Sequence, residues 1–342
     1  MPIILDAMGS DTFPDPEIEG ALQAAELYQE EIILVGNENL VSPKLSALNT
    51  KALPVRIVNA PDILEMGEKP VEAARRKPNN SMAIGLKLVK DGVGAAFVTA
   101  GNTGGAMFNA LRILGRIKGV ARPALTALIP VKNGYCVVVD VGANADCRPE
   151  FLLQFAIMGS VYAEKLLGKQ SPTVGLLSNG EEAGKGNQLI KDTYPLLENS
   201  GLNFVGNVEG KELFGGFADV VVTDGFTGNI MLKSSEAVAK LLTDQLKQEL
   251  MSGILTKIGA LLAKPAFVNL KKKLDPSEIG AAPLLGIDGL VYIGHGRSNS
   301  RAIFSAIRVA RQAAATNLLP TLRSTIADRL VLVENPSQVK EG

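Results

Sequence analysis

Two glycine-rich segments with related sequences contain residues that could bind an anion. They are residues 98–107, VTAGNTGGAM, and residues 222–231, VTDGFTGNIM, which share Thr, Gly, Thr, Gly and Met at the same offsets. Each follows a short apolar run and leads into a segment of helical character, which predicts a strand, a tight turn and a helix N-terminus. The first N–H groups of a helix lack internal partners and lie at the positive end of its dipole. We therefore expect the two turns to bind a phosphate or carboxylate together.

Further polar residues occupy predicted turns at the ends of strands. Asn and Asp in such turns commonly cap helices, so a structural role is the alternative for each of them. His295 lies between two glycines and can be a loop residue, and Lys185 can be a solvated partner of the neighbouring glutamates. As a set, however, these side chains suit holding an anion and stabilising developing negative charge. The residues are Asp6, Asn102, Asn144, Lys185, Asn187, Asp224, Asn229, His295 and Ser298.

The sequence lacks the residues of several familiar mechanisms. His295 is the only histidine, and neither a GxSxG motif nor the Cys-plus-His signature of papain-like enzymes occurs, so an acyl-enzyme is not expected. No GxGxxG motif and no complete Walker A motif is present. With one histidine and two unclustered cysteines, zinc is not expected either. We expect an enzyme without metal or cofactor, whose nucleophile comes with the substrate.

Composition and charge indicate a globular cytosolic protein. The 342 residues are 46% apolar and 20% charged, which is enough for one large α/β unit or two lobes. Lys plus Arg equals Asp plus Glu at 35 each, so the net charge offers no support for nucleic-acid binding. Cys136 and Cys147 have neither metal nor disulfide spacing and suit reduced thiols. The sequence shows no signal-peptide pattern, and no run of about 18 apolar residues that could span a bilayer.

Apolar runs rich in Val, Ile and Leu alternate with helical patterns along the chain. Each run is continuous and ends at a small or polar turn, which is typical of strands covered on both faces in a mostly parallel sheet. Ligands of such folds bind outside the carboxyl ends of the strands. We predict one α/β unit over residues 1–342, with helices on both faces of a mostly parallel sheet and two lobes around a cleft. The expected strands are 3–5, 32–35, 95–98, 136–141, 174–177, 220–222 and 290–293. The expected helices are 15–29, 81–91 and 149–167, each with a start signal.

Residues 251–274 differ from the rest of the chain because they contain five lysines and no acidic residue. At about 100° per residue, the apolar side chains fall on one side of a helix that Pro265 is expected to end. Such a helix can pack on the core or on a second subunit, and it can equally lie in a membrane surface. The segment Asn229–Leu250 is expected to carry it away from the sheet. The predicted membrane-contact residues are Ile254, Leu255, Ile258, Leu261 and Leu262.

Several short sequence motifs, separated by other residues, follow one another along the chain from Ile4 to about Gln312. They are Asp6–Asp11, Asn80–Met82, Thr99–Gly104, Gly115–Gly119, Asp140–Asn144, Lys185–Asn187, Thr223–Asn229 and Gly294–Gly296. In these motifs the chain resembles the bacterial phosphate acyltransferases, which convert acyl-acyl carrier protein and inorganic phosphate into acyl phosphate for phospholipid synthesis.

The resemblance implies a fold similar to isocitrate and isopropylmalate dehydrogenases and to phosphotransacetylases. It also implies a homodimer and a cytosolic enzyme that contacts the membrane peripherally, which favours the membrane interpretation of residues 251–274. Acyl carrier protein and inorganic phosphate are the implied partners, and the carrier supplies a thioester substrate. By motif match, Lys185 and Asn229 are the strongest site candidates.

These inferences lead to a hypothesis of direct acyl transfer. Phosphate binds at the Thr103–Gly104 turn, where Asn102 and Lys185 steady it, and attacks the thioester carbonyl. Asn229 and a backbone N–H hold the oxyanion, and His295 protonates the departing thiolate. The expected catalytic residues are Lys185, Asn229 and His295. The expected substrate-binding residues are Asp6, Gly9, Asn102, Thr103, Gly104, Asn144, Asn187, Asp224, Thr227 and Ser298.

Two other functions fit parts of the sequence. One is a metal- and NAD-dependent decarboxylating dehydrogenase, in which Asp6, Asp140 and Asp224 are the metal ligands. The other is a non-catalytic membrane scaffold that binds an acidic carrier protein through the basic segment Arg75–Lys77.

Overall fold

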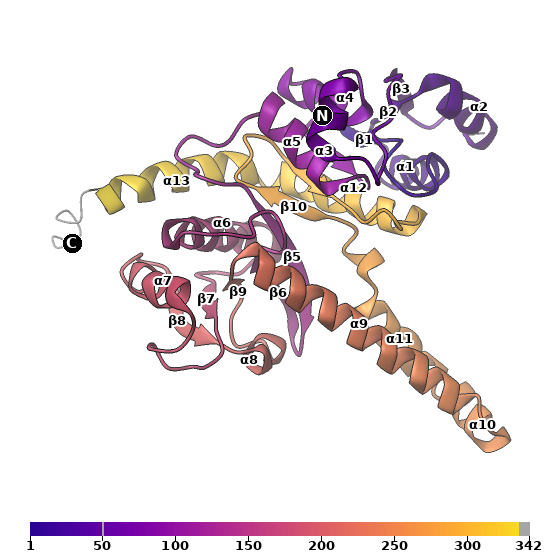
Figure 1. The fold of residues 1–342 in the computed structure, drawn as a ribbon. Helices are drawn as coiled ribbons and strands as arrows, with labels where there is room; N and C mark the ends of the chain where they lie inside the picture. The colour runs from indigo at the N-terminus through magenta and orange to yellow at the C-terminus, as the bar shows by residue number, and fades with distance from the viewer. Residues whose placement is uncertain (50, 335–342) are drawn as a thin grey trace.

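The computed structural model describes residues 1–49 and 51–334 (Figure 1). Within these residues, an eleven-stranded sheet has the order β3-β2-β1-β4-β11-β10-β5-β6-β9-β7-β8. The strands are β1 (Ile3–Asp6), β2 (Ile32–Gly36), β3 (Val55–Asn59), β4 (Ala96–Thr99), β5 (Ala124–Val131), β6 (Gly134–Val139), β7 (Thr173–Leu177), β8 (Asn203–Val208), β9 (Val220–Val222), β10 (Ala282–Leu285) and β11 (Val291–Ile293). The helices are α1 (Asp15–Tyr28), α2 (Glu38–Leu48), α3 (Pro70–Arg76), α4 (Ser81–Lys90), α5 (Thr103–Ile113), α6 (Pro149–Leu167), α7 (Gln188–Glu198), α8 (Gly210–Gly215), α9 (Gly225–Leu250), α10 (Ile254–Leu262), α11 (Lys264–Leu274), α12 (Ser300–Ala315) and α13 (Leu318–Glu334). The seven strands and three helices that were predicted with residue ranges for the sheet and its covering helices are present to within two residues.

The predicted mostly parallel sheet is confirmed, but two antiparallel strands divide it. Strands β3, β2, β1, β4 and β11 form one parallel group, and β6, β9, β7 and β8 form another. Between them, β10 runs antiparallel to both β11 and β5, and β5 runs antiparallel to β6. The two parallel groups therefore point in opposite directions.

The register of β10 and β5 brings the carboxyl ends of both groups to one level. Ile293 at the end of β11 pairs with Ala282, the first residue of β10. Leu284 of β10 pairs with Leu125 of β5, so Pro283 is level with Thr126. Thr126 in turn pairs with Val139 at the end of β6. Val139 is thus level with Pro283, one residue from the level of Ile293. Ligand-binding turns at the two carboxyl edges can consequently face each other.

Helices cover both faces of the sheet, as alternate residues of β1 show. Ile3 and Leu5 belong to a core cluster with residues of α1, α6 and α12, whereas Ile4 belongs to a second cluster with residues of α4 and α5. All three side chains are buried because each face of the strand is covered by a helical layer. This burial accounts for the continuous apolar runs that predicted these strands.

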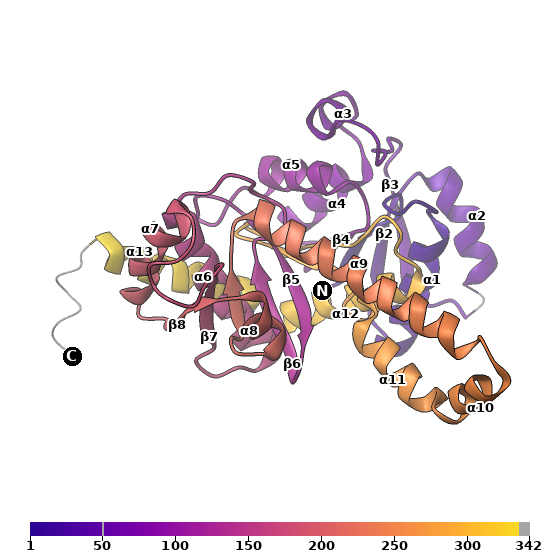
Figure 2. The same ribbon diagram turned by 60° about the horizontal axis from the view of Figure 1, so that its bottom comes forward.

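Helices α9, α10 and α11 extend away from the sheet (Figures 1 and 2). Helix α9 leads outward over 26 residues, α10 lies at the far end, and α11 returns. The expectation that Pro265 ends a helix is wrong: α10 ends at Leu262, and Pro265 lies in the first turn of α11, where a missing N–H costs nothing. The side chains of Lys271 and Lys272 lie outside the described residues.

The far end of this excursion exposes apolar side chains. Helix α10 contains no buried residue, so within this chain the core-packing interpretation is wrong. The exposed fractions of the predicted contact residues are 80% for Ile254, 85% for Leu255, 53% for Ile258, 70% for Leu261 and 78% for Leu262. Across the part of the chain that the structure describes, none of the helices has the combined length and apolarity needed to span a bilayer.

Candidate active site

A cavity of about 340 Å³ lies where the carboxyl ends of the two parallel groups meet. Both glycine-rich turns reach it, because Thr103 is the first residue of α5 and Asn229 lies near the start of α9. Its volume is near the lower end for small-molecule sites, which suits a phosphate and a carbonyl group better than a dinucleotide. The polar residues of its lining are Thr103, Asn229, Lys233, Glu236 and His295.

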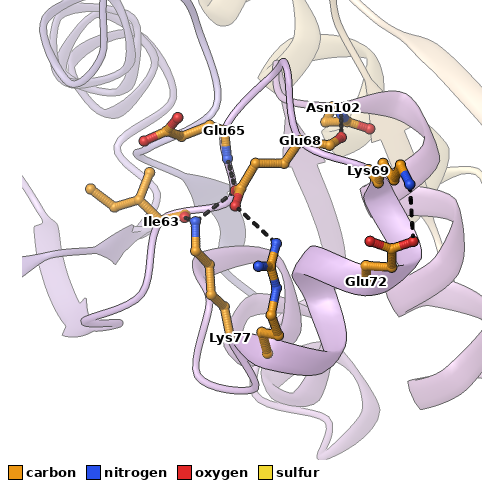
Figure 3. Close-up of polar contacts among 8 residues, drawn as sticks. Ile63, Glu65, Glu68, Lys69, Glu72, Lys77 and Asn102 are labelled. Carbon is orange, nitrogen blue, oxygen red and sulfur yellow. Dashed lines mark hydrogen bonds and ion pairs between the residues drawn. The ribbon is translucent and has the colours of Figure 1, made fainter.

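The first turn presents two free backbone N–H groups. Asn102 caps α5, because its Oδ1 accepts a backbone N–H of the first helical turn at 3.0 Å. Its Nδ2 donates to the carbonyl of Met66 at 2.9 Å. It also donates to the carbonyl of Glu68 at 3.4 Å (Figure 3), so the whole amide is used in holding this loop. Among the described contacts, the N–H groups of Thr103 and Gly104 have no acceptor. Helix α5 can therefore offer its positive end to an anion.

The second turn is already neutralised by its own residues. Asp224 caps α9, and its carboxylate accepts both the backbone N–H and the hydroxyl of Thr227 at 2.8 Å. The N–H of Gly225 donates to the carbonyl of Asn144 at 2.7 Å. A carboxylate at the positive end of a helix dipole stabilises the helix and repels a second anion. Asp224 and Thr227, both expected to bind substrate, thus serve here as the cap of α9.

Asn229 is the residue that the second turn contributes to the cavity. It lies one helical turn after Gly225 and is half-buried. Its side chain faces Gly142, since a Cβ built on that glycine would lie 3.9 Å from the amide carbon of Asn229. Gly142 itself has φ +145°, a conformation that favours glycine. The amide is thereby directed into the space between the two strand groups.

A buried carboxylate braces the first turn. Asp6 accepts the N–H of Met8 at 3.0 Å and the hydroxyl of Thr99 at 2.6 Å, and the Thr99 oxygen accepts the N–H of Gly101 at 3.0 Å. Burial raises the pKa of Asp6, and these hydrogen bonds offset part of the rise. Gly9 lies against the same turn, because a Cβ there would be 2.8 Å from the nitrogen of Gly101. Asp6 and Gly9 therefore shape the turn from behind and are absent from the described cavity lining.

A second buried carboxylate braces the opposite side. Asp140 accepts the N–H groups of Leu125 at 3.0 Å, Gly142 at 3.1 Å, Ala143 at 3.0 Å and Asn144 at 2.7 Å. The amide of Asn144 donates to it as well, at 2.9 Å. Burial raises the pKa of Asp140, and these donors oppose the rise. Asn144 is thus a positioning residue, since its carbonyl in turn fixes the start of α9.

His295 and two residues of α9 form the outer part of the cavity. The His295 side chain is 60% exposed, and its Nε2 lies 4.0 Å from Oε1 of Glu236. Lys233 follows Asn229 by one helical turn and lines the same cavity. Ser298 is buried, and its N–H donates to the carbonyl of His295 at 2.9 Å. Ser298 therefore holds the loop that carries the histidine.

Lys185 and Asn187 lie on the same carboxyl edge but outside the described lining of the cavity. Their loop follows β7, which is two strands from β6 in the sheet. Asn187 caps α7, and its Oδ1 accepts a backbone N–H of that helix at 3.0 Å. Lys185 is exposed, and its N–H donates to the carbonyl of Glu182 at 2.9 Å. Roles for these residues in catalysis and binding stay predictions, and the cation of the described cavity lining is Lys233.

Lys233 and Glu236 were not among the predicted site residues. Their spacing of four and seven residues from Asn229 was the available signal, because residues so spaced lie on one face of a helix. A helical continuation of the second turn would have placed all three side chains together.

The metal-ligand set of the dehydrogenase alternative is not assembled. Asp6, Asp140 and Asp224 each accept hydrogen bonds from their own turns. Within the described residues they do not form a cluster that brings their oxygens within metal-binding distance of one another. That alternative is wrong in its proposed ligands.

Solved structures of two phosphotransacylases share the fold of this chain. The phosphotransacetylase from Streptococcus pyogenes is similar with a TM-score of 0.58 at 17% identity, covering 91% of this chain and 94% of that one. The branched-chain phosphotransacylase from Enterococcus faecalis V583 is similar with a TM-score of 0.58 at 14% identity, covering 91% and 99%. At such low identities the likeness concerns the fold alone, and that fold is the one found in phosphotransacylases.

The sequence relatives define the family. The model of the family described as fatty acid synthesis protein matches residues 1–320. The phosphate acyltransferase of Pelotomaculum thermopropionicum is 48% identical over 326 residues, 95% of each chain. That of Elusimicrobium minutum is 46% identical over 329 residues, 96% of each chain. The chain belongs to this family of phosphate acyltransferases and is an acyltransferase, which overturns the non-catalytic scaffold alternative.

Proposed function

We propose that the chain transfers a fatty acyl group from acyl-acyl carrier protein to inorganic phosphate, and so supplies acyl phosphate for phospholipid synthesis. The observation that carries this proposal is that Thr103 of the first turn and Asn229 of the second line one cavity. The names of the relatives support phosphate as the acceptor. The free N–H groups of α5 supply a site for it.

Phosphate binds at the N-terminus of α5 in this scheme. The N–H groups of Thr103 and Gly104 donate to its oxygens, and the neutral cap Asn102 adds no repulsion. Lys233 balances the charge from the opposite side of the cavity. Lys185 is a second candidate for this role if its loop moves inward, because it lies on the same carboxyl edge.

The thioester carbonyl lies between the bound phosphate and Asn229. A phosphate oxygen attacks the carbonyl carbon, a C–O bond forms, and the C–S bond then breaks to release the carrier thiolate. The amide N–H of Asn229 donates to the oxyanion of the tetrahedral intermediate, where such donors act most strongly. The proton of hydrogen phosphate ends on the departing sulfur, so acyl phosphate and free thiol are the products.

In this scheme His295 moves that proton. Its ring is exposed at the mouth of the cavity, where a departing thiolate would leave, and Glu236 lies 4.0 Å from it. A carboxylate at that distance can orient the ring as the proton is passed on.

The finer assignments of fold and assembly belong to the same proposal. The proposal includes a fold like that of isocitrate and isopropylmalate dehydrogenases; one solved dehydrogenase, the 4-hydroxythreonine-4-phosphate dehydrogenase from Burkholderia phymatum, is similar with a TM-score of 0.50 at 14% identity. A homodimer is supported by Leu241 and Leu242 of α9, which are 58% and 64% exposed and would leave water in an interface. We place the enzyme in the cytoplasm with peripheral membrane contact.

The membrane contact is assigned to α10. Its five apolar side chains are more than half exposed, and Lys257 and Lys264 flank them, a combination that favours an anionic lipid surface. The acyl phosphate would then be released close to a membrane-bound acceptor.

Replacing Leu261 and Leu262 with Glu tests the membrane contact. We expect sedimentation with anionic liposomes to be lost, while unfolding free energy changes by no more than about 0.5 kcal/mol because both side chains are exposed. Thiol release from soluble substrate should stay at the wild-type rate. Unfolding of the variant, or a collapse into monomers without loss of liposome binding, would contradict the assignment.

Release of free thiol from acyl-acyl carrier protein tests the reaction itself. We expect release that depends on added phosphate and yields one acyl phosphate per thiol. Release at the same rate without phosphate would contradict the proposal, because water would then be the acceptor.

A further inference from the structure

A group of cations lies at the end of α5 that is farther from the cavity. The loop after α5 surrounds an open depression of about 410 Å³, lined by residues 115–120 together with Leu111. Four exposed basic side chains belong to this helix end and loop. We call them the basic hollow: Arg112, Arg116, Lys118 and Arg122.

The charge of the basic hollow is not compensated. No aspartate or glutamate occurs in the sequence between Asp91 and Asp140, and in the described part of the chain none of the four cations forms an ion pair. Asp288 is an acidic residue next to the loop, because its backbone N–H donates to the carbonyl of Gly115 at 3.0 Å. Asp288 is already paired with Arg323 at 2.6 Å. The hollow therefore presents positive charge to solvent.

The loop that carries these cations is held in one conformation. Gln154 of α6 accepts the N–H of Ala121 at 2.8 Å and donates to the carbonyl of Gly119 at 3.0 Å. Arg116 donates to the carbonyl of Ala121, and Ile117 is buried in the main core cluster. A surface fixed in this way loses little conformational freedom when a partner binds.

The basic segment Arg75–Lys77 shows the opposite arrangement (Figure 3). Lys77 donates to Glu68 at 2.6 Å and to the carbonyl of Ile63 at 2.8 Å, and Arg76 lies 3.8 Å from the same glutamate. The hydrogen bond from Lys77 lowers the pKa of Glu68, which keeps that carboxylate charged. Two of the three cations are thus engaged within the chain, so this segment is the weaker candidate for an acidic partner.

One face of α5 joins the basic hollow to the cavity. Thr103, Met107 and Leu111 are spaced by four residues and lie on the same side of the helix. Thr103 lines the cavity, Met107 is half-buried, and Leu111 is 36% exposed and lines the hollow. From Thr103 to Leu111 the helix rises roughly 12 Å. An extended arm lying on this face would reach from the hollow to the bound phosphate.

We propose that the basic hollow is the docking site of the acidic carrier protein, and that the Thr103–Met107–Leu111 face of α5 guides its thioester arm to the cavity. The inference rests on the proposed function for the identity of the substrate. Complementary charge at such a surface mainly speeds encounter and fixes orientation, and salt screens it.

The double variant Arg112→Glu/Lys118→Glu tests the docking site, because both side chains are exposed and make no described hydrogen bond. We expect the KM for acyl-acyl carrier protein to rise roughly tenfold or more, with kcat nearly unchanged. The same acyl group on a short thiol that lacks the protein should be turned over as by the wild type. Raising the salt concentration should increase the wild-type KM for the carrier thioester and reduce the difference between wild type and variant.

Lys132→Glu/Lys191→Glu is the matched control, since it reverses two exposed charges on other surfaces, one of them at the opposite end of β5. We expect it to behave as the wild type. An equal rise in KM for the control and the test variant would overturn the docking site, as would a rise in the single variant Arg75→Glu with none in Arg112→Glu/Lys118→Glu. If neither the carrier thioester nor the short thioester releases thiol with the wild type, the proposed function fails instead, so the two failures are distinguishable.

Discussion

The two glycine-rich turns are near twins in sequence and different in structure. When the sequences are aligned, Gly101 matches Gly225. However, α5 begins two residues after Gly101, whereas α9 begins at Gly225 itself. The first turn is capped by the neutral Asn102 and the second by the charged Asp224. The same pattern of glycines and threonines thus yields one helix end that can accept an anion and one that is already neutralised.

The difference assigns separate tasks to the two turns. The first has no described acceptor for the N–H groups of Thr103 and Gly104, and Thr103 lines the cavity. In the second turn, Asp224 caps the N-terminus of α9. The residue that this turn contributes to the cavity is Asn229, one helical turn further along. Repetition of a sequence motif therefore does not imply repetition of its chemistry, because the position of the cap decides where the free N–H groups lie.

The largest expected effect comes from removing the contribution of the second turn. In our account Asn229→Ala removes one oxyanion donor, so kcat should fall about 100- to 1000-fold with little change in the phosphate KM. The side chain is half-buried, and the circular dichroism spectrum should stay native. Gln245→Ala, an exposed position on the same helix, is the control and should retain full activity. Near-normal turnover of Asn229→Ala would remove this residue from the mechanism.

The buried acid Glu17 supports the first turn and makes that part of the molecule sensitive to pH. Glu17 of α1 accepts the N–H of Ser10, in the loop that lies against the first turn. Burial raises the pKa of Glu17 from 4.5 to about 7, and the nearby Asp6 adds a smaller rise. A raised carboxyl pKa stabilises the fold below pH 4.5, and this stability is lost as the pH rises through 7.

We expect Glu17→Gln to remove that dependence. Relative to the variant, the unfolding free energy of the wild type should fall by about 3 kcal/mol between pH 4.5 and 7, at 1.36 kcal/mol per pKa unit. Chemical denaturation at several pH values measures the difference. If the unfolding free energies of wild type and variant change in parallel with pH, Glu17 titrates normally and does not make the first turn sensitive to pH.

The same charge placed at each turn should have unequal effects. Thr103→Asp adds a carboxylate at the exposed first residue of α5 and should raise the phosphate KM roughly tenfold, since like charges at short range cost more than 1 kcal/mol. Phe226→Asp adds one near the start of α9, where the side chain is 61% exposed, and should leave the phosphate KM unchanged. Thr103→Asn, which adds no charge, is the control. Equal increases in the two Asp variants would mean that both turns contact the phosphate.

Much of the fold could be predicted from the sequence because the buried parallel strands are continuous apolar runs. Strand β5 was not predicted, since its residues are only partly buried and include Pro130, and β10 is short and includes Pro283. These two strands are the ones that reverse direction and bring both carboxyl edges to one level. The meeting of the two turns at one cavity thus depends on two strands that no continuous buried apolar run marks in the sequence.

The candidate site was predicted in part for a related reason. Turn residues such as Asn229 and His295 could be found because Gly and Asn mark strand ends. Lys233 and Glu236 could not be found in this way, since they lie inside a helix. Conversely, Asn102 and Asn187 are residue types found in binding turns, but the side-chain oxygen of each caps a helix. Because an Asn oxygen can either cap a helix or contact a ligand, the residue type does not distinguish the two roles.

A crystal structure of the enzyme grown in phosphate tests the central claim most directly. We predict a phosphate whose oxygens accept the N–H groups of Thr103 and Gly104, with the amide of Asn229 directed toward it across the cavity. A phosphate bound instead at the start of α9, or beside Lys185 outside the cavity, would contradict the division of tasks between the two turns.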